Sequence, residues 1–231
     1  MKKPTHRSLM RLIRTVGKQF LVSQFRLGQA RSAFRSESID ALGDPIPWFT
    51  YPAVEFLKQF DFSSKRVFEW GSGNSTLFWA RRASEVTAVE DNEDWYREVQ
   101  AKLPQGARIH LQKEAPGYVG VIDSVEDCDV IVIDGTFRWD CALVATKHLA
   151  AGGMIIVDNS WGHPGICAHL GTTGDLIQVD FIGFTPVTGG LNSTSIFLSR
   201  DFAFPSRDGL RPWIQTGGPA RPDWISPENW R

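Results

Sequence analysis

Cysteine is scarce in this sequence of 231 residues, which contains Cys128, Cys141 and Cys167 and no Cys-x-x-Cys pair. The scarcity excludes a disulfide-dense scaffold and a cysteine-rich zinc site, and it indicates a reducing compartment. Apolar runs long enough to cross a membrane are also missing, as is the uninterrupted apolar stretch of a secretory signal. We therefore expect a cytoplasmic protein, and peripheral contact with the inner membrane stays open.

Acidic residues are missing from residues 1–36, which contain nine Lys and Arg. The rest of the chain carries sixteen basic and twenty-six acidic side chains, so a basic arm precedes an acidic body. An acidic body argues against a large nucleic-acid surface, and we therefore expect no nucleic-acid partner.

Basic and apolar side chains recur at helical spacing within this arm. The basic set is Arg7, Arg11, Arg14 and Lys18, and the apolar set is Leu9, Leu12, Ile13, Val16 and Phe20. At ~100° per residue the two sets lie on opposite faces of one helix. Such a helix can rest on an anionic membrane surface through residues 1–35, or it can pack on its own domain or on a second subunit of a homo-oligomer.

Strand and helix patterns alternate from Lys65 onward. The expected strands are 66–69, 86–90, 108–113, 129–134, 154–157, 176–184 and 193–198, and the expected helices between them are 75–83, 93–103 and 139–150. No helix fits between the last two strands, so they should form an antiparallel hairpin. The alternation predicts an α/β fold, namely a doubly wound, Rossmann-like, mostly parallel seven-stranded sheet that ends in this hairpin.

The same patterns divide the chain. We predict a basic amphipathic helical arm (1–36), a linker and helix (37–64), the α/β domain (65–200) and a Pro/Trp-rich C-terminal tail (201–231). Thr50 can cap the helix of the second segment, with Pro52 in the first turn of that helix.

A Glu-x-Gly-x-Gly motif at 69–73 follows the first strand and precedes a helix. Glycine permits a tight turn and lets a ligand approach the backbone. Glu90 ends the next strand, where a carboxylate can accept hydrogen bonds from both hydroxyls of a ribose. The alternatives are an ordinary glycine turn and a solvated acid.

With these features the sequence resembles the class I S-adenosylmethionine (SAM)-dependent methyltransferases over about 67–199. The motif, Glu90, the strand 129–134, the Gly-Gly strand that leads to Asp158-Asn159 and the closing hairpin carry the likeness. The segments 47–57, 158–160 and 194–198 are similar to a little-characterised bacterial branch of these enzymes.

The resemblance implies that the domain 65–200 binds SAM and that the protein transfers a methyl group to a small-molecule acceptor. The implied cofactor residues are Glu69, Gly71, Gly73, Asn74, Ser75 and Glu90. In this arrangement the two glycines lie under SAM, Glu69 orients its amino-acid end and Glu90 holds the ribose. Asp127 or Cys128 is implied near the adenine.

Oxygen-bearing side chains end two further strands, with Asp134 after the fourth and Asp158-Asn159 after the fifth. Such ligands suit Mg²⁺, and the set resembles the metal site of catechol-type O-methyltransferases, in which a metal lowers the pKa of the acceptor hydroxyl. The residues that follow Asp134 depart from the Asp-Ala-Asp-Lys pattern of those enzymes. The alternative at Asp158-Asn159 is a turn with backbone hydrogen bonds. This set, and the lack of an Asn-Pro-Pro-Tyr motif, favour an oxygen acceptor on a small molecule or a glycan.

Without a metal, a side chain must take the acceptor proton. His163 is the leading candidate because a histidine titrates near neutral pH, and Asp134 and Asp158 are the alternatives. Arg138 can grip an anionic acceptor or form a structural ion pair with Asp140 or another acid.

Two other functional classes stay open. An NAD-dependent oxidoreductase shares the strand, glycine turn and acid, but the third glycine and a Tyr-x-x-x-Lys pair are missing. A non-catalytic SAM-binding protein that is recruited to a membrane would also retain the fold and the basic arm.

Overall fold

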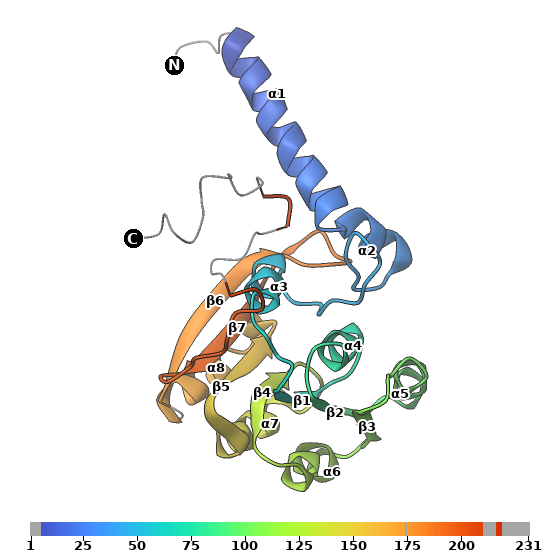
Figure 1. Ribbon diagram of the computed structural model, residues 1–231, viewed down its shortest axis with the longest axis vertical. Coiled ribbons are helices and arrows are strands. Elements are labelled where there is room, and N and C mark those ends of the chain that lie inside the picture. The colour runs from blue at the N-terminus through green and yellow to red at the C-terminus, as the bar shows by residue number, and fades with distance from the viewer. Residues whose placement is uncertain (1–5, 174, 210–215, 219–231) are drawn as a thin grey trace.

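The computed structural model describes residues 6–173, 175–209 and 216–218. Within these residues, seven strands form one mixed sheet in the order β3-β2-β1-β4-β5-β7-β6 (Figure 1). The strands are β1 (Arg66–Trp70), β2 (Glu85–Glu90), β3 (Ala107–Leu111), β4 (Cys128–Ile133), β5 (Leu149–Asp158), β6 (Leu176–Phe184) and β7 (Leu191–Ser199). The predicted α/β class and doubly wound sheet are confirmed.

Strand direction fixes where a ligand can bind. β1 to β5 pair in parallel, whereas β7 pairs antiparallel with β5 and β6 pairs antiparallel with β7, which confirms the predicted hairpin. The chain winds outward in one direction from β1 and in the other from β4. In open α/β sheets the crevice beside such a switch point, at the carboxyl ends of the strands, is where ligands bind.

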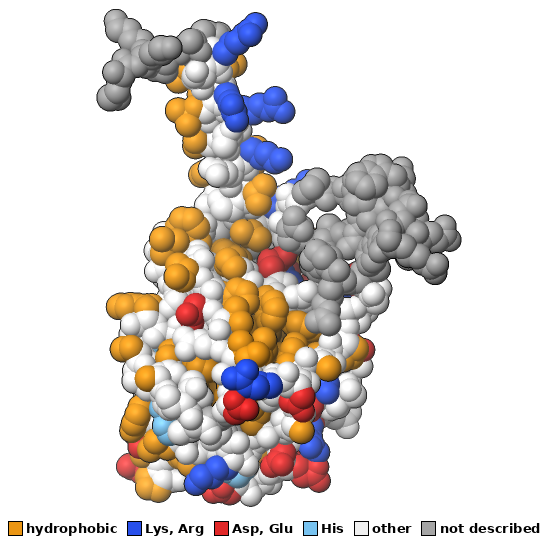
Figure 2. Space-filling view, turned by 90° about the vertical axis from the view of Figure 1, so that its left-hand side faces the viewer, with side chains coloured by type: hydrophobic (Ala, Val, Ile, Leu, Met, Phe, Trp, Pro, Cys, Tyr) orange, Lys and Arg blue, Asp and Glu red, His pale blue; other side chains and the backbone are white. Residues whose placement is uncertain are grey.

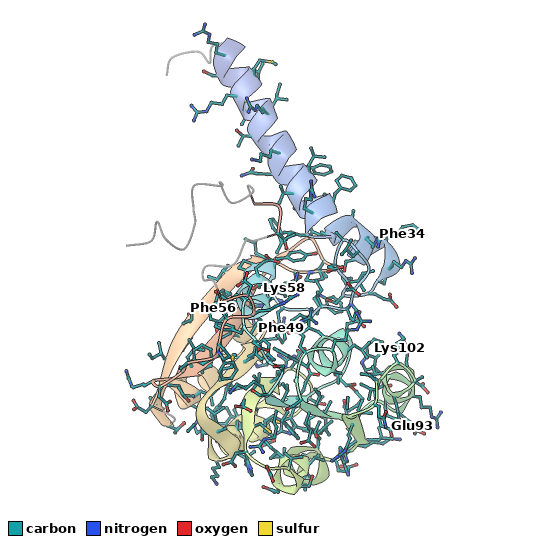
Figure 3. All side chains as sticks on the ribbon, in the orientation of Figure 1. Phe34, Phe49, Phe56, Lys58, Glu93 and Lys102 are labelled. Atoms are coloured by element: carbon teal, nitrogen blue, oxygen red, sulfur yellow. The ribbon has the colours of Figure 1, made fainter. Side chains whose placement is uncertain are left out.

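Helices cover both faces of the sheet (Figure 1). The helices are α1 (His6–Leu21), α2 (Gln29–Arg35), α3 (Tyr51–Lys58), α4 (Asn74–Ala80), α5 (Glu93–Gln100), α6 (Ala115–Gly120), α7 (Arg138–Ala145) and α8 (Pro164–Thr173). Side chains from α3 and α4 pack in one apolar layer, and side chains from α6, α7 and α8 pack in the other. α5 adds Val99 to a small cluster with Ala88 and Ile109, while Glu93 and Lys102 lie on its outer side (Figure 3).

The central strand β4 shows why both faces are covered. Val130 and Val132 point into the layer of α3 and α4, and Ile131 and Ile133 point into the opposite layer. All four side chains are fully buried. A continuous apolar run of this kind is typical of a strand buried on both sides.

Two local predictions differ from the structure. The predicted helix 139–150 is present but ends two residues early: α7 stops at Ala145, a 3₁₀ helix covers Thr146–His148, and β5 begins at Leu149. Gly152 (φ +72°) and Gly153 accommodate an irregularity where β5 pairs with β4. A Cβ on Gly153 would lie 2.8 Å from the carbonyl oxygen of Asp129. Thr50 does precede α3, but its hydroxyl donates to the carbonyl oxygen of Phe181 (3.0 Å) and does not cap the helix.

The N-terminal arm divides into two parts. α1 projects from the body, whereas α2 is docked on it, since the Gln29 side chain donates to the carbonyl oxygens of Thr185 and Thr188. Among the described residues, no helix combines the length and the apolar composition of a membrane span. Of the tail 201–231, residues 210–215 and 219–231 lie outside the described residues.

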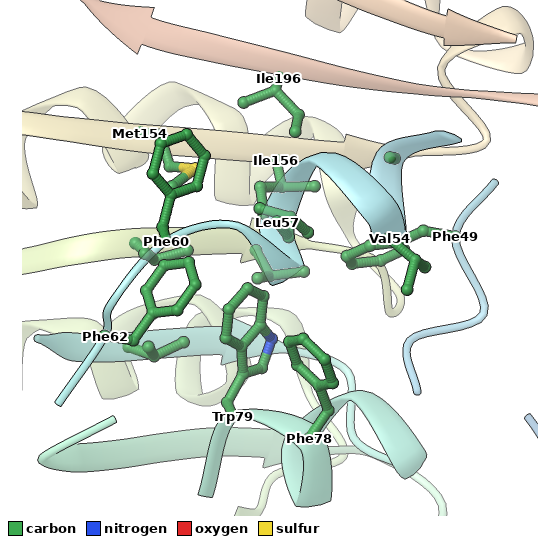
Figure 4. Close-up of a cluster of buried hydrophobic side chains, with 14 of the residues drawn as sticks. Phe49, Val54, Leu57, Phe60, Phe62, Phe78, Trp79, Met154, Ile156 and Ile196 are labelled. Carbon is green, nitrogen blue, oxygen red and sulfur yellow. The ribbon is translucent and has the colours of Figure 1, made fainter. Parts of the chain in front are cut away.

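Trp79 is the largest side chain in the layer of α3 and α4 (Figure 4), where its ring packs edge-on against Phe62 and Phe78. Its indole N–H is buried without a hydrogen-bond partner. We predict that Trp79→Ala lowers the free energy of unfolding by about 3–5 kcal/mol. Trp79→Phe, which also removes the unpartnered N–H, should cost much less. Urea denaturation measures both, and equal losses in the two variants would contradict this packing role.

Candidate functional site

The turn after β1 joins the ends of three strands. Gly71 has a φ of +97° and donates its N–H to the carbonyl oxygen of Val89 (2.9 Å) at the end of β2. A Cβ on Gly71 would lie 2.7 Å from the backbone nitrogen of Gly135, just past β4. Both the backbone angle and the close approach therefore require glycine at position 71.

Glu90 lies beside this turn, as the sequence predicted. Its Oε2 accepts the Ser72 hydroxyl (2.7 Å), and its Oε1 accepts the backbone N–H groups of Asp91 (3.1 Å) and Asn92 (3.0 Å). The side chain is buried, and burial raises its pKa although these hydrogen bonds oppose the shift. The carboxylate is therefore held in one orientation next to the glycine turn. Sequence reasoning missed Ser72, whose hydroxyl fixes this orientation.

Glu69 is fully buried beneath the turn. Its Oε2 accepts the Thr76 hydroxyl (2.5 Å), and its Oε1 has no hydrogen-bond partner among the residues that the structure describes. Burial raises the pKa of Glu69 to about 8, and the nearby carboxylates of Asp134 and Glu90 add to the shift. Thr76 stands at the position of the third glycine in a Gly-x-Gly-x-x-Gly motif. A glycine there would let the helix pack closely against the strand, whereas the Thr76 side chain contacts Glu69 instead.

The side chains of Asn74 and Ser75, the first two residues of α4, have different surroundings. The Asn74 side-chain amide donates to the carbonyl oxygen of Ser38 (2.8 Å), so this group fastens the preceding segment to the helix. Ser75 is buried directly below the turn.

Trp95 covers the outer side of the turn, which sequence reasoning also missed. Its indole N–H donates to the carbonyl oxygen of Ser72 (2.7 Å). A Cβ on Gly73 would lie 3.5 Å from the indole ring, so glycine leaves room for the ring to pack closely. Since 42% of Trp95 stays exposed, it presents a flat aromatic surface next to Glu90 and the glycine turn.

Arg138 stands between the carboxylates that follow β4 and β5. Its guanidinium donates to Asp134 Oδ1 (3.0 Å), to the carbonyl oxygen of Asp158 (2.7 Å) and to Asn159 Oδ1 (3.4 Å). The side chains of Asp134 and Asn159 therefore meet on a cation that the chain itself supplies, whereas Asp158 contributes its backbone carbonyl to that cation. The structural ion pair that was one of the two alternatives for Arg138 is present, with Asp134 as the acid.

This arrangement does not fit the tentative Mg²⁺ site. Arg138 already engages Asp134 Oδ1 and Asn159 Oδ1, and a metal on the same oxygens would lie against the guanidinium charge. The carboxylate of Asp158 accepts the Thr194 hydroxyl (2.6 Å). Among the described residues, no cluster of three His, Cys, Asp or Glu side chains is arranged to hold a metal.

The carboxyls of Asp134 and Asp158, next to Arg138, have raised pKa values. Burial raises the pKa of Asp158 to about 8, and the neighbouring Asp134 adds to the shift. Burial also raises the pKa of Asp134, against the opposing effect of Arg138. Asp158 is buried, whereas 30% of the Asp134 side chain stays exposed, and both residues accept a hydrogen bond from Arg138.

His163 lines a cavity of about 490 Å³ beside this cluster, together with Phe137, Arg138 and Trp139. Burial and the positive charge of Arg138 lower the pKa of His163 below its usual value of 6.5, so the imidazole is neutral at pH 7. Phe137 has a φ of +50°, in the left-handed region that bulky residues rarely adopt. Such strain is common where a side chain is held at a functional site.

One expected contact is wrong. Asp127 and Cys128 lie at the amino end of β4, where Arg66 Nε donates to the carbonyl oxygen of Asp127 (2.9 Å) at the start of β1. Because the strands are parallel, this is the opposite edge of the sheet from Glu90. These two residues cannot contact the adenine of a ligand bound at the glycine turn.

Solved structures with this architecture are numerous. The O-methyltransferase from Bacillus cereus in complex with S-adenosylhomocysteine (SAH) aligns with a TM-score of 0.50 and 17% identity, over 65% of this chain and 78% of that one. The chain has the fold of the class I SAM-dependent methyltransferases. No protein-family model and no curated protein matches the sequence.

Two further structures with the methyltransferase fold align less well. The N-methyltransferase NodS from Bradyrhizobium japonicum, also in complex with SAH, has a TM-score of 0.46 and 13% identity over 59% of this chain and 78% of that one. An rRNA methylase from Streptococcus thermophilus has a TM-score of 0.47 and 10% identity over 63% and 90% of the two chains.

The raised pKa of Glu69 makes folding stability depend on pH. Because the folded-state pKa of about 8 exceeds the ordinary value of 4.5, stability is lost as the pH rises through this interval. We predict that Glu69→Gln removes this loss, so that the variant gains roughly 3 kcal/mol on the wild type between pH 5 and pH 9. Urea denaturation at several pH values measures the difference. Parallel stability curves for the two proteins would contradict the raised pKa.

Proposed function

We propose that the protein transfers the methyl group of SAM to a hydroxyl of a small-molecule or glycan-type acceptor. The observation that carries the proposal is the 2.7 Å hydrogen bond from Ser72 to Glu90, which holds a carboxylate next to the glycine turn at the switch point of the sheet. Adenosine-type ligands bind at this place in doubly wound folds. The SAH complex of the Bacillus cereus protein adds support.

Each part of the turn suits one part of SAM. Among the described residues, Glu90 Oε2 accepts a single hydrogen bond, from Ser72, so it can accept another from a ribose hydroxyl. Glu69 Oε1 has no partner and lies below the turn, where it can orient the amino-acid end through Ser75 or backbone N–H groups. Trp95 offers a stacking surface to a flat base.

The acceptor side is the cavity lined by Phe137, Trp139 and His163. Its aromatic rings suit the face of a sugar or a phenol, and its volume of about 490 Å³ suits a small molecule or a single sugar unit. Arg138 is held by four acceptors, among them the carbonyl oxygen of Gly135, so its role here is to position the cluster.

His163 is the proposed general base. The sulfonium of SAM already activates the methyl group, so the protein must mainly align donor and acceptor. As the bond from the acceptor oxygen to the methyl carbon forms, the bond from carbon to sulfur breaks and its electrons neutralise the sulfonium. The acceptor proton moves to the neutral imidazole of His163, and SAH and the methyl ether leave.

Calorimetry with SAH tests the cofactor half of this proposal. We predict that Glu90→Ala weakens SAH binding roughly 10- to 100-fold, as expected for a hydrogen bond to a charged group. Glu85→Ala is the matched control, because Glu85 lies at the opposite end of the same strand and should bind SAH as the wild type does. His163→Gln should also retain SAH affinity, but it should lose transfer of label from SAM to hydroxyl acceptors.

The contradicting results are distinct. Failure of the wild type to bind SAH, or tighter binding of NAD(H) than of SAH, would overturn the methyltransferase proposal. Tight SAH binding with no labelled product from a metabolite extract would instead favour a non-catalytic SAM-binding protein. Retention of full transfer activity in His163→Gln would remove His163 as the base.

A further inference from the structure

α1 projects from the body of the protein, and its side chains extend outward from the helix (Figures 1 and 3). None of the side chains of residues 7–21 is buried. The exposed apolar side chains of this helix include Leu9 (50%), Leu12 (57%), Ile13 (58%), Val16 (53%) and Phe20 (58%). Among the residues that the structure describes, nothing therefore buries this apolar face on its own domain.

The apolar and basic side chains of α1 occupy separate faces. Figure 2 shows hydrophobic side chains along one side of the projecting helix and Lys and Arg along the other. At ~100° per residue, Arg7, Arg11, Arg14 and Lys18 fall within an arc of ~60°. Phe25, which is 60% exposed in the π-helical turn Val22–Arg26, extends the apolar face through its ring contact with Phe20.

A helix with an exposed apolar face is more stable when another surface covers that face. An isolated helix of 16 residues is only marginally stable in water, and α1 has no acidic residue in its first turn to favour it. Within the part of the chain that the structure describes, none of its side chains from residue 7 onward is buried against the body. The apolar face is therefore left available to another surface.

Charge and geometry select the kind of surface. Residues 1–36 contain nine Lys and Arg and no acid, whereas the rest of the chain is acidic. An anionic surface would therefore attract α1 and repel the body, and α1 already stands clear of the body. A second copy would bring the same positive charge to the contact.

The width of the apolar face of α1 also favours a lipid surface over a second helix. Leu12 and Leu21 are nine residues apart and therefore lie ~180° apart around the helix, with the other apolar side chains between them. A paired helix covers a narrower stripe, while a flat lipid surface can cover half the circumference. With a length of about 24 Å and a basic face, α1 suits a position along the membrane surface, not across it.

We propose that α1 is an interfacial helix that binds an anionic lipid surface and holds the protein at a membrane. The apolar face enters the boundary between headgroups and acyl chains. The basic side chains, which have long flexible stems, reach the lipid phosphates from the other side of the helix. This inference does not depend on the methyltransferase proposal, since it concerns residues remote from the glycine turn.

Co-sedimentation of the full chain with vesicles tests the inference. We expect binding to vesicles of phosphatidylcholine with 30% phosphatidylglycerol, weak binding to phosphatidylcholine alone, and release as salt is added. Val16→Glu, in the centre of the apolar face, should lower binding at least tenfold. Thr15→Glu is the matched control, because it adds the same charge to the adjacent residue outside the apolar face and should weaken binding only by roughly fivefold.

Three results would overturn the inference. One is the absence of wild-type binding to the anionic vesicles, and another is equal loss of binding in Val16→Glu and Thr15→Glu. The third is a dimer by light scattering that Val16→Glu converts to a monomer while neither protein binds vesicles, which would assign the apolar face to a second copy of the chain. Circular dichroism and thermal unfolding of Val16→Glu show whether the variant is folded, and this control does not depend on binding of SAH.

Discussion

The backbone contact between Gly71 and Gly135 is the constraint from which the site follows. The two glycines let the ends of β1 and β4 approach so closely that a side chain on either would collide with the other. That approach leaves Glu69 buried beneath the turn and places Ser72 within hydrogen-bonding distance of Glu90. One short turn thereby positions both carboxylates that a ligand of the crevice would meet.

Arg138 positions the residues at the carboxyl ends of β4 and β5. A guanidinium has several donors in a fixed plane, so one side chain can join Asp134, Asp158 and Asn159. The same charge lowers the pKa of His163 and keeps the imidazole neutral beside the cavity. The arrangement of side chains at the carboxyl ends of β4 and β5 thus depends on the permanent positive charge of Arg138.

Much of the fold could be predicted because its signals are local in sequence. The apolar run at 129–134, the glycines after β1 and the unbroken hairpin identify the strands, their direction and the binding edge. The partners of Glu90 and the place of Arg138 could not be predicted, since they arise from side chains that meet only after folding. α6 and α8 were missed because neither short segment has a clear apolar period, and β5 begins early because Gly152 and Gly153 tolerate an irregular pairing. The division of the chain into arm, linker, domain and tail stays a prediction.

Hydrogen–deuterium exchange with and without SAH tests most directly whether the glycine turn and the end of β2 hold one ligand. The account predicts that saturating SAH slows exchange together at the amides of 71–76 and 90–95, while the amides of 125–129 at the opposite edge of the sheet do not change. Protection at the opposite edge, or protection of only one of the two segments at full SAH occupancy, would contradict it.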